Sequence, residues 1–150
     1  MEAVTFPDND VVEFINANLI PVRLAHDAKP QSEDFQVKWT PTLIILDEAG
    51  KEHHRTVGFL SPEELIPSLM LGIAKSHFER ESFDQAIKWL EKLIEGYPNS
   101  SFTPEAIFLK GVSLYKTTHE AAPLKEAYEE LQSRFPNNEW TKRAYPYRLL

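Results

Sequence analysis

A repeat with an offset of 38 residues constrains the fold of this chain more than any other feature. Aromatic, leucine and Pro-Asn positions of the second half recur at this offset and keep helical spacing. The pairs are Leu90 with Tyr128, Glu91 with Glu129, Leu93 with Leu131, Tyr97 with Phe135, Pro98 with Pro136, Asn99 with Asn137, Phe102 with Trp140 and Ala106 with Ala144. Periods of this length are typical of stacked helical hairpins. We therefore expect residues 67–150 to form an antiparallel stack of helical hairpins, in which a proline ends each second helix.

Each unit resembles a tetratricopeptide repeat (TPR), which pairs two helices through small residues and closes at a proline. The matching positions are Met70, Ile73, Ala74, His77, Ala86, Leu90 and Pro98 in the first unit, and Phe108, Gly111, Val112, Tyr115, Leu124, Tyr128 and Pro136 in the second. Glu81 departs from the pattern, because glycine is usual there. His77 and Tyr115 occupy the repeat's tyrosine position, where we expect either a half-buried packing residue or a contact to a bound peptide. Two units are fewer than the three that an independent stack needs, so we expect a helix over 141–145 to cap the open end.

Residues 1–66 show the alternation of helix and strand that is typical of an α/β unit. The expected elements are, in order, a helix over 11–19, a buried strand over 19–25, a short helix over 31–37, a strand over 42–46 with both faces covered, a strand over 51–57 and a helix from Ser61 onward. The run 42–46 is uninterruptedly apolar, which favours a strand buried on both faces. Asp47 to Gly50 supply turn residues, so the two strands around them are expected to form a β-hairpin.

The segment around Pro41 resembles the second half of a thioredoxin fold. The residues that carry this resemblance are Phe35, Val37, Trp39-Thr40-Pro41-Thr42, Leu43 to Asp47, Gly50-Lys51-Glu52, Val57-Gly58-Phe59 and Glu63-Glu64-Leu65. Residues 1–16 are similar to the helix that follows the family's Cys-x-x-Cys motif. The resemblance implies a cis Thr40–Pro41 bond in a loop that presents backbone to an extended peptide. Trp39, Thr40 and Pro41 are therefore candidate peptide-binding residues, the alternative being a turn that only directs the β-hairpin.

The sequence also departs from that family. In the family, a strand that leads to Cys-x-x-Cys lies between the strands that match 19–25 and 42–46. This sequence begins after both features and contains no cysteine, and thiol–disulfide exchange requires a thiolate. We expect either that Met1 is an internal methionine of a longer reading frame, or that the protein has lost its redox half. The strand 42–46 would expose an apolar edge, which we expect rearranged pairing within the chain or a second copy, in a homodimer, to cover.

Composition argues against several other classes of protein. Sixteen basic against 23 acidic residues give a net charge of −7, which disfavours nucleic acid as a partner. No apolar run approaches the roughly 20 residues that span a bilayer. His53 and His54 are neighbours on a predicted strand and would point to opposite faces, so we expect no metal site there. No motif indicates a cofactor.

We therefore expect an α/β plus α architecture: an incomplete thioredoxin-like βαββα unit over 1–66, followed by TPR-like helical hairpins over 67–150. The expected function is a non-catalytic interaction module that binds a protein or peptide partner, with Trp39, Thr40, Pro41, His77 and Tyr115 as candidate contact residues. The alternative is the C-terminal part of a thiol–disulfide oxidoreductase whose Cys-x-x-Cys precedes Met1. A cytoplasmic location is expected, or a periplasmic one if an upstream signal is missing.

Overall fold

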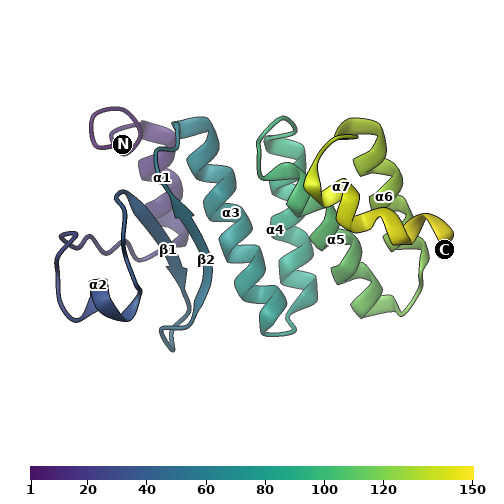
Figure 1. Ribbon diagram of the computed structural model, residues 1–150, viewed down its shortest axis with the longest axis horizontal. Helices are drawn as coiled ribbons and strands as arrows, with labels where there is room; N and C mark the ends of the chain where they lie inside the picture. The colour runs from purple at the N-terminus through teal and green to yellow at the C-terminus, as the bar shows by residue number, and fades with distance from the viewer.

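The structure is a computed structural model that describes all 150 residues (Figure 1). Its first part contains α1 (Asn9–Asn18), α2 (Gln31–Asp34), β1 (Thr42–Leu46) and β2 (Glu52–Val57). Its second part contains α3 (Pro62–Glu79), α4 (Phe83–Gly96), α5 (Thr103–Thr118), α6 (Ala122–Arg134), α7 (Glu139–Ala144) and a closing 3₁₀ helix (Tyr145–Leu149). None of these helices is apolar over a length that would reach across a bilayer. The predicted architecture, an incomplete α/β unit followed by antiparallel helical hairpins, is confirmed.

The two strands form the predicted β-hairpin. β1 and β2 pair antiparallel, with an irregularity in register after Ile45. Asp47 closes the turn, because its carboxylate accepts the backbone N–H groups of Ala49 and Lys51, each at 2.9 Å. Gly50 adopts a φ of +78°, a left-handed conformation that favours glycine. The turn residues thus fix which residues of the two strands face each other.

One face of the β-hairpin packs against α3, which also contacts α1. The buried centre of this contact consists of Val11, Leu65, Ile66 and Leu69, with Leu43 and Ile45 of β1 packed against it. A Cβ atom at Gly72 would lie only 2.6 Å from the Ile45 Cγ1 atom and 3.1 Å from the His54 Cβ atom. Glycine at this position therefore lets α3 approach the strands closely.

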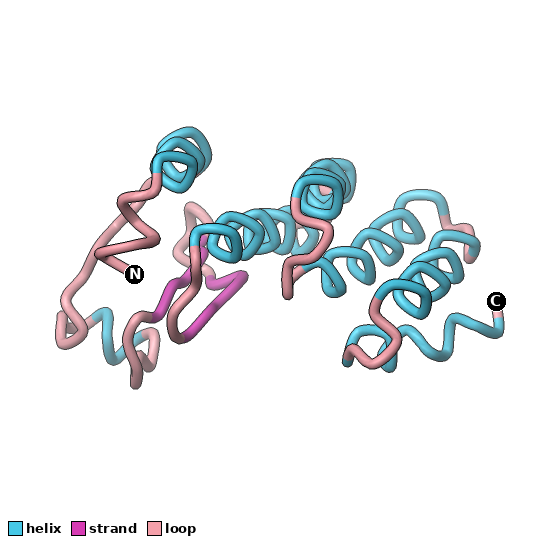
Figure 2. The backbone as a smooth tube through the Cα atoms, turned by 90° about the horizontal axis from the view of Figure 1, so that it is seen from above, coloured by secondary structure: helices cyan, strands magenta, loops and turns pink.

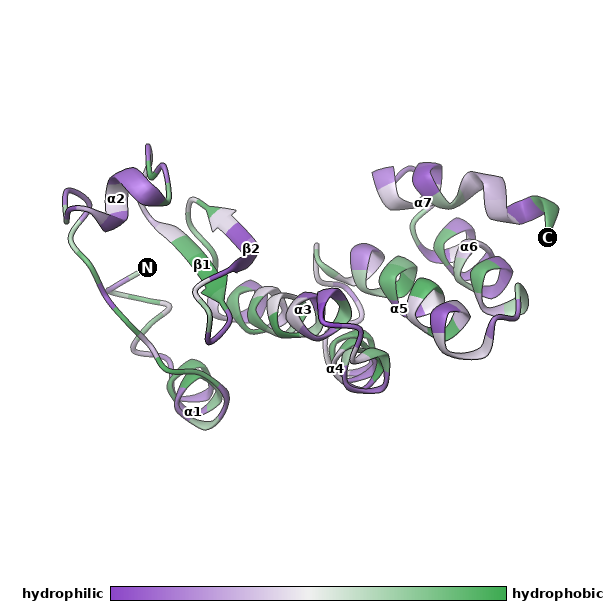
Figure 3. Cartoon of the chain, turned by 90° about the horizontal axis from the view of Figure 1, so that it is seen from below, coloured by the Kyte–Doolittle hydropathy of each residue, from purple (hydrophilic) through white to green (hydrophobic).

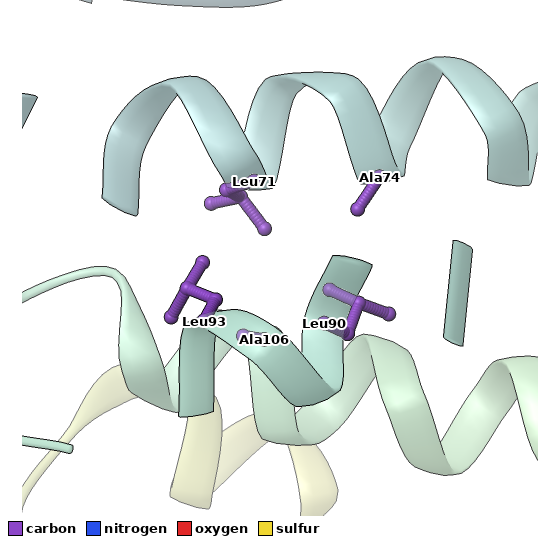
Figure 4. Close-up of a cluster of buried hydrophobic side chains, with 5 residues drawn as sticks. All are labelled: Leu71, Ala74, Leu90, Leu93 and Ala106. Atoms are coloured by element: carbon purple, nitrogen blue, oxygen red, sulfur yellow. The ribbon is translucent and has the colours of Figure 1, made fainter. Parts of the chain in front are cut away.

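The second part is a row of helices in which each packs against the next from α3 to α6 (Figure 2). Leu71 and Ala74 of α3, Leu90 and Leu93 of α4, and Ala106 of α5 form a fully buried cluster between these helices (Figure 4). The small residues act as predicted at the close contacts: a Cβ at Gly111 would lie 2.6 Å from the Ala127 Cβ atom. The helix expected to cap the stack is α7, which packs against both α5 and α6. Because α3 is continuous, the same helix contacts the β-hairpin and begins the stack.

The 38-residue repeat is visible in the backbone and its hydrogen bonds. Thr103 donates its hydroxyl to the Tyr97 carbonyl at 2.5 Å, and Thr141 donates to the Phe135 carbonyl at 2.6 Å. The two acceptor residues end α4 and α6 with nearly the same dihedral angles, φ −132° and ψ 58° against φ −136° and ψ 53°.

The turns inside the two helical hairpins repeat in the same way. Glu81 and His119 both adopt the left-handed conformation, with φ of 59° and 61°. Glu81 and His119 are 38 residues apart and are therefore structurally equivalent. Glu81 stands where glycine is usual, and His119 follows α5 directly.

Three expectations for the first part were wrong. Residues 19–25 form no strand, because no neighbouring strand exists to accept and donate their backbone hydrogen bonds. β1 is not buried on both faces: four of its residues are half-buried and Leu46 is exposed. The rearranged pairing that would close the sheet within the chain is not present either, because the sheet consists of β1 and β2 alone.

Candidate interaction surfaces

The loop before β1, residues 39–41, presents an aromatic side chain and an unpaired peptide group; we call it the Pro41 loop. The Thr40–Pro41 bond is cis, as the resemblance implied. The Pro41 carbonyl accepts the Gly58 N–H at 2.8 Å, and the Thr42 hydroxyl donates to the Trp39 carbonyl at 2.6 Å, so both sides of the loop are held. The backbone of Thr40 forms no hydrogen bond within the chain, and Trp39 is 71% exposed. This loop can offer a donor, an acceptor and an apolar contact to an extended peptide.

β1 has a strand partner on only one of its two edges. Opposite residues of an antiparallel pair alternate between hydrogen-bonded and non-bonded positions, and the bond from Gly58 to Pro41 sets this alternation. Thr42 and Ile44 therefore direct their N–H and C=O groups away from β2, and these groups have no partner in the chain. β1 is also predominantly apolar, unlike the mostly polar β2 (Figure 3). The backbone of Thr42 and Ile44, which we call the open edge, is of the kind that recruits another strand.

A second unpaired stretch, residues 20–24, follows α1; we call it the apolar segment. Its side chains Ile20, Val22 and Leu24 are 92%, 75% and 53% exposed. None of its backbone N–H groups donates a hydrogen bond within the chain. Exposed apolar residues that lie together mark interaction sites more often than exposed residues that occur singly.

His77 and Tyr115 lie on the helical stack, apart from the Pro41 loop. His77 is half-buried near the end of α3, and its pKa is lowered by burial and, less, by the charge of Arg80. Tyr115 is exposed near the end of α5. The helix between Ser61, close to Gly58 in the chain, and His77 is about 24 Å long. The structure therefore places the five candidate residues on two surfaces and does not bring them into one site.

A buried polar cluster surrounds His53, and no residue pattern in the sequence indicates it. The His53 side chain is fully buried and lies between two carboxylates: its Nε2 is 2.8 Å from the Asp47 Oδ2 atom and its Nδ1 is 3.0 Å from the Glu79 Oε2 atom. The pKa of Asp47 is lowered chiefly by its hydrogen bond with His53, and that of Glu79 chiefly by its hydrogen bond with Lys51. This cluster ties the β-hairpin turn to the end of α3.

His54 has a different environment from its neighbour. Its Nε2 lies 3.1 Å from the Ser68 hydroxyl, and its ring meets that of Phe102 edge to face. Burial, with a smaller contribution from the charge of Lys75, lowers the pKa of His54 to about 4. The two histidines thus contact different groups. Each side chain connects β2 to α3.

Comparison with known proteins agrees with this geometry. Residues 1–71 match the family described as a thioredoxin-like domain, and residues 68–100 match the family described as a tetratricopeptide repeat. None of the curated proteins and none of the solved structures compared with the chain gave a match. The two matched regions meet within α3, the helix that contacts both the β-hairpin and α4. The two matches follow each other along the chain in the order predicted from its residues, a thioredoxin-like region and then a tetratricopeptide-like region, which confirms the predicted arrangement.

Proposed function

We propose that this chain is a non-catalytic interaction module that binds an extended peptide segment of a partner protein at the Pro41 loop. The observation that carries the proposal is the unpaired backbone of Thr40 beside the exposed Trp39. One peptide N–H and one C=O are thereby available next to a large apolar surface. An extended peptide satisfies such groups by backbone hydrogen bonds and gains affinity from a buried aromatic residue.

The helical stack supports the same function from a second surface. A tetratricopeptide repeat suggests protein–protein interaction, and the two helical hairpins are complete in the structure. His77 and Tyr115 occupy equivalent positions of the two repeats in sequence, so we assign them to contacts with a different part of the partner. Because about 24 Å of α3 separates His77 from the start of that helix beside the Pro41 loop, one short peptide would not reach both surfaces.

Peptide binding by Trp39→Ala tests the proposal. Peptides selected from an array by the unaltered chain should bind Trp39→Ala at least about tenfold more weakly, the loss expected for an aromatic hot spot. Tyr145→Ala removes an exposed aromatic residue of the 3₁₀ helix and should leave affinity unchanged. Equal affinity of the Trp39→Ala chain, or an array in which no peptide binds, would contradict the proposal.

The second candidate function is the C-terminal part of a thiol–disulfide oxidoreductase. The observation that favours it is the position of the first residues: Thr5 donates its hydroxyl to the Leu60 carbonyl at 2.6 Å, two residues after Gly58, which bonds Pro41. A segment preceding Met1 would therefore start near the Pro41 loop. Translation of the upstream DNA decides the matter: an in-frame Cys-x-x-Cys and disulfide reductase activity of the longer product support this function. An in-frame stop codon directly upstream contradicts it.

A further inference from the structure

We propose that two copies of this chain pair through the apolar segment and the open edge, so that each copy completes the sheet of the other. In Figures 1 and 2 the apolar segment leaves α1 as a loop and does not join β1 and β2. This self-association uses other residues than the proposed peptide contact at Trp39 and Thr40, and the two proposals can fail independently.

Each chain contains two complementary sets of backbone groups that do not satisfy each other. The donors of the apolar segment are the N–H groups of Ile20, Val22, Arg23 and Leu24, and none has a partner in the chain. The open edge supplies the unpaired groups of Thr42 and Ile44. A second copy brings an extended apolar segment to an apolar strand edge, which is the usual way in which such edges are closed.

Twofold symmetry lets both copies do this at once. The resulting sheet runs β2, β1, the second copy's apolar segment, the first copy's apolar segment, then β1 and β2 of the second copy. The symmetry axis passes between the two apolar segments, which makes them antiparallel and the contact isologous. With Val22 opposite its own copy, Ile20 faces Leu24 on the same side of the sheet. Pro21 and Arg23 then direct their backbone groups toward β1 of the other copy, where Pro21 offers only its carbonyl and Arg23 offers both its N–H and its carbonyl.

The size and charge of the contact fit a dimer. A fully exposed aliphatic side chain presents about 100 Å² of apolar surface. The buried area of the dimer, counted over both copies and including the surfaces that these side chains meet, is therefore on the order of 1,000 Å² for Ile20, Val22 and Leu24. This is the size at which specific interfaces begin. Arg23 is the one charged residue of the apolar segment, and it pairs with Glu2 of its own chain. Pairing two copies therefore brings no uncompensated like charges together.

Sedimentation equilibrium of the full chain over a range of concentrations tests the dimer. We expect twice the monomer mass for the unaltered chain and the monomer mass for Val22→Asp. Val22 is 75% exposed within one chain, so the substitution leaves the fold of a single copy intact, which circular dichroism verifies. Leu149→Asp places the same charge at an exposed leucine of the 3₁₀ helix and should remain dimeric. A monomeric unaltered chain, or a Val22→Asp chain that stays dimeric, overturns the proposal.

Because the chain has no cysteine, one introduced thiol reports the position of the axis. Val22→Cys should form a covalent dimer on mild oxidation, since directly opposed residues of antiparallel strands lie close enough for a disulfide. Leu149→Cys should not cross-link under the same conditions. Amide hydrogen exchange tests the same contact independently. The amides of Val22 and Ile44 should be protected from exchange in the unaltered chain and unprotected in Val22→Asp. Equal cross-linking of both cysteine variants, or free exchange in the unaltered chain, overturns the assignment.

Discussion

His53 and His54 show how adjacent residues of one strand occupy different environments. The imidazole of His53 lies between the carboxylates of Asp47 and Glu79. His54 is half-buried against Ser68 and Phe102, where the charge of Glu52 only partly offsets the effect of burial on its pKa. Burial of the ring therefore favours the neutral form of His54. Both side chains contact α3, so they fasten the β-hairpin to the helical stack at two points.

The half-buried ring of His54 makes the protein sensitive to mild acid. Its pKa is lowered from 6.5 to about 4, so below pH 6.5 the unfolded chain binds a proton that the folded chain does not. The free energy of unfolding should fall as the pH decreases from 6.5 to 4, by up to about 3 kcal/mol in total from this group. Urea denaturation at several pH values measures the effect.

His54→Gln provides the comparison for this pH dependence. It should unfold with a flatter pH dependence between pH 6.5 and 4, because glutamine does not titrate. His77 titrates in the same direction but is present in both proteins, so their difference isolates His54. Identical slopes for the two proteins would show that His54 is not held in its neutral form.

Glu81 occupies a left-handed turn position that glycine adopts with less strain. Glu81→Gly should raise the free energy of unfolding by up to about 1 kcal/mol, because the relieved strain exceeds the added entropy of the unfolded chain. Glu126→Gly, at an exposed position inside α6, should instead lower it by about 1 kcal/mol. Thermal or urea unfolding of the two variants gives both values. A decrease for both would contradict the strain assigned to Glu81.

At the scale of elements, the contact of α3 with the β-hairpin depends on the absence of a side chain at Gly72. An added methyl group would lie 2.6 Å from the Ile45 Cγ1 atom, so Gly72→Ala should destabilise the protein by about 1–3 kcal/mol through overpacking. Gly96→Ala is the matched control, since nothing lies within 4 Å of its Cβ position; it should leave stability unchanged or slightly raised. The urea midpoints of both variants measure this, and a Gly72→Ala chain as stable as the control would contradict the close approach.

Elements whose partners are close in the sequence were predictable. β1 and β2 are joined by a turn of recognisable residues, and the helical hairpins repeat the same closing residues, Tyr97-Pro98 and Phe135-Pro136. Residues 19–25 carry the composition of a buried strand, but a strand forms only against another strand, and composition does not reveal whether that partner is present. The predicted elements were therefore correct where their partners are local, and wrong at 19–25.

The candidate site was predictable to a similar degree. The Pro41 loop was found because its residues are contiguous and resemble a known family. The cluster around His53 was missed because Glu79 is 26 residues away and reaches the histidine only when α3 folds over the β-hairpin. His77 and Tyr115 were grouped with the Pro41 loop by function, although the length of α3 separates them. The distance between surfaces on different elements depends on tertiary packing, and residue patterns alone do not show it.

At the scale of the whole molecule, α3 packs against both the β-hairpin and the helical stack and so connects the two units. One side of this helix packs on the β-hairpin through Gly72, and another contributes Leu71 and Ala74 to the core of the helical stack. The Pro41 loop lies near its beginning and the His53 cluster at its end. A peptide bound at the Pro41 loop would thus be held at one end of the helix that starts the repeats.

Nuclear magnetic resonance titration with an array-selected peptide tests the central claim most directly. The amide resonances of Trp39, Thr40 and Thr42 and of Gly58 and Phe59 should shift in proportion to bound peptide, because these residues form the Pro41 loop and its support. The same titration of Trp39→Ala should produce no such shifts at equal peptide concentration. Shifts confined to other parts of the chain, or equal shifts in both proteins, would contradict the claim that the Pro41 loop is the peptide-binding surface.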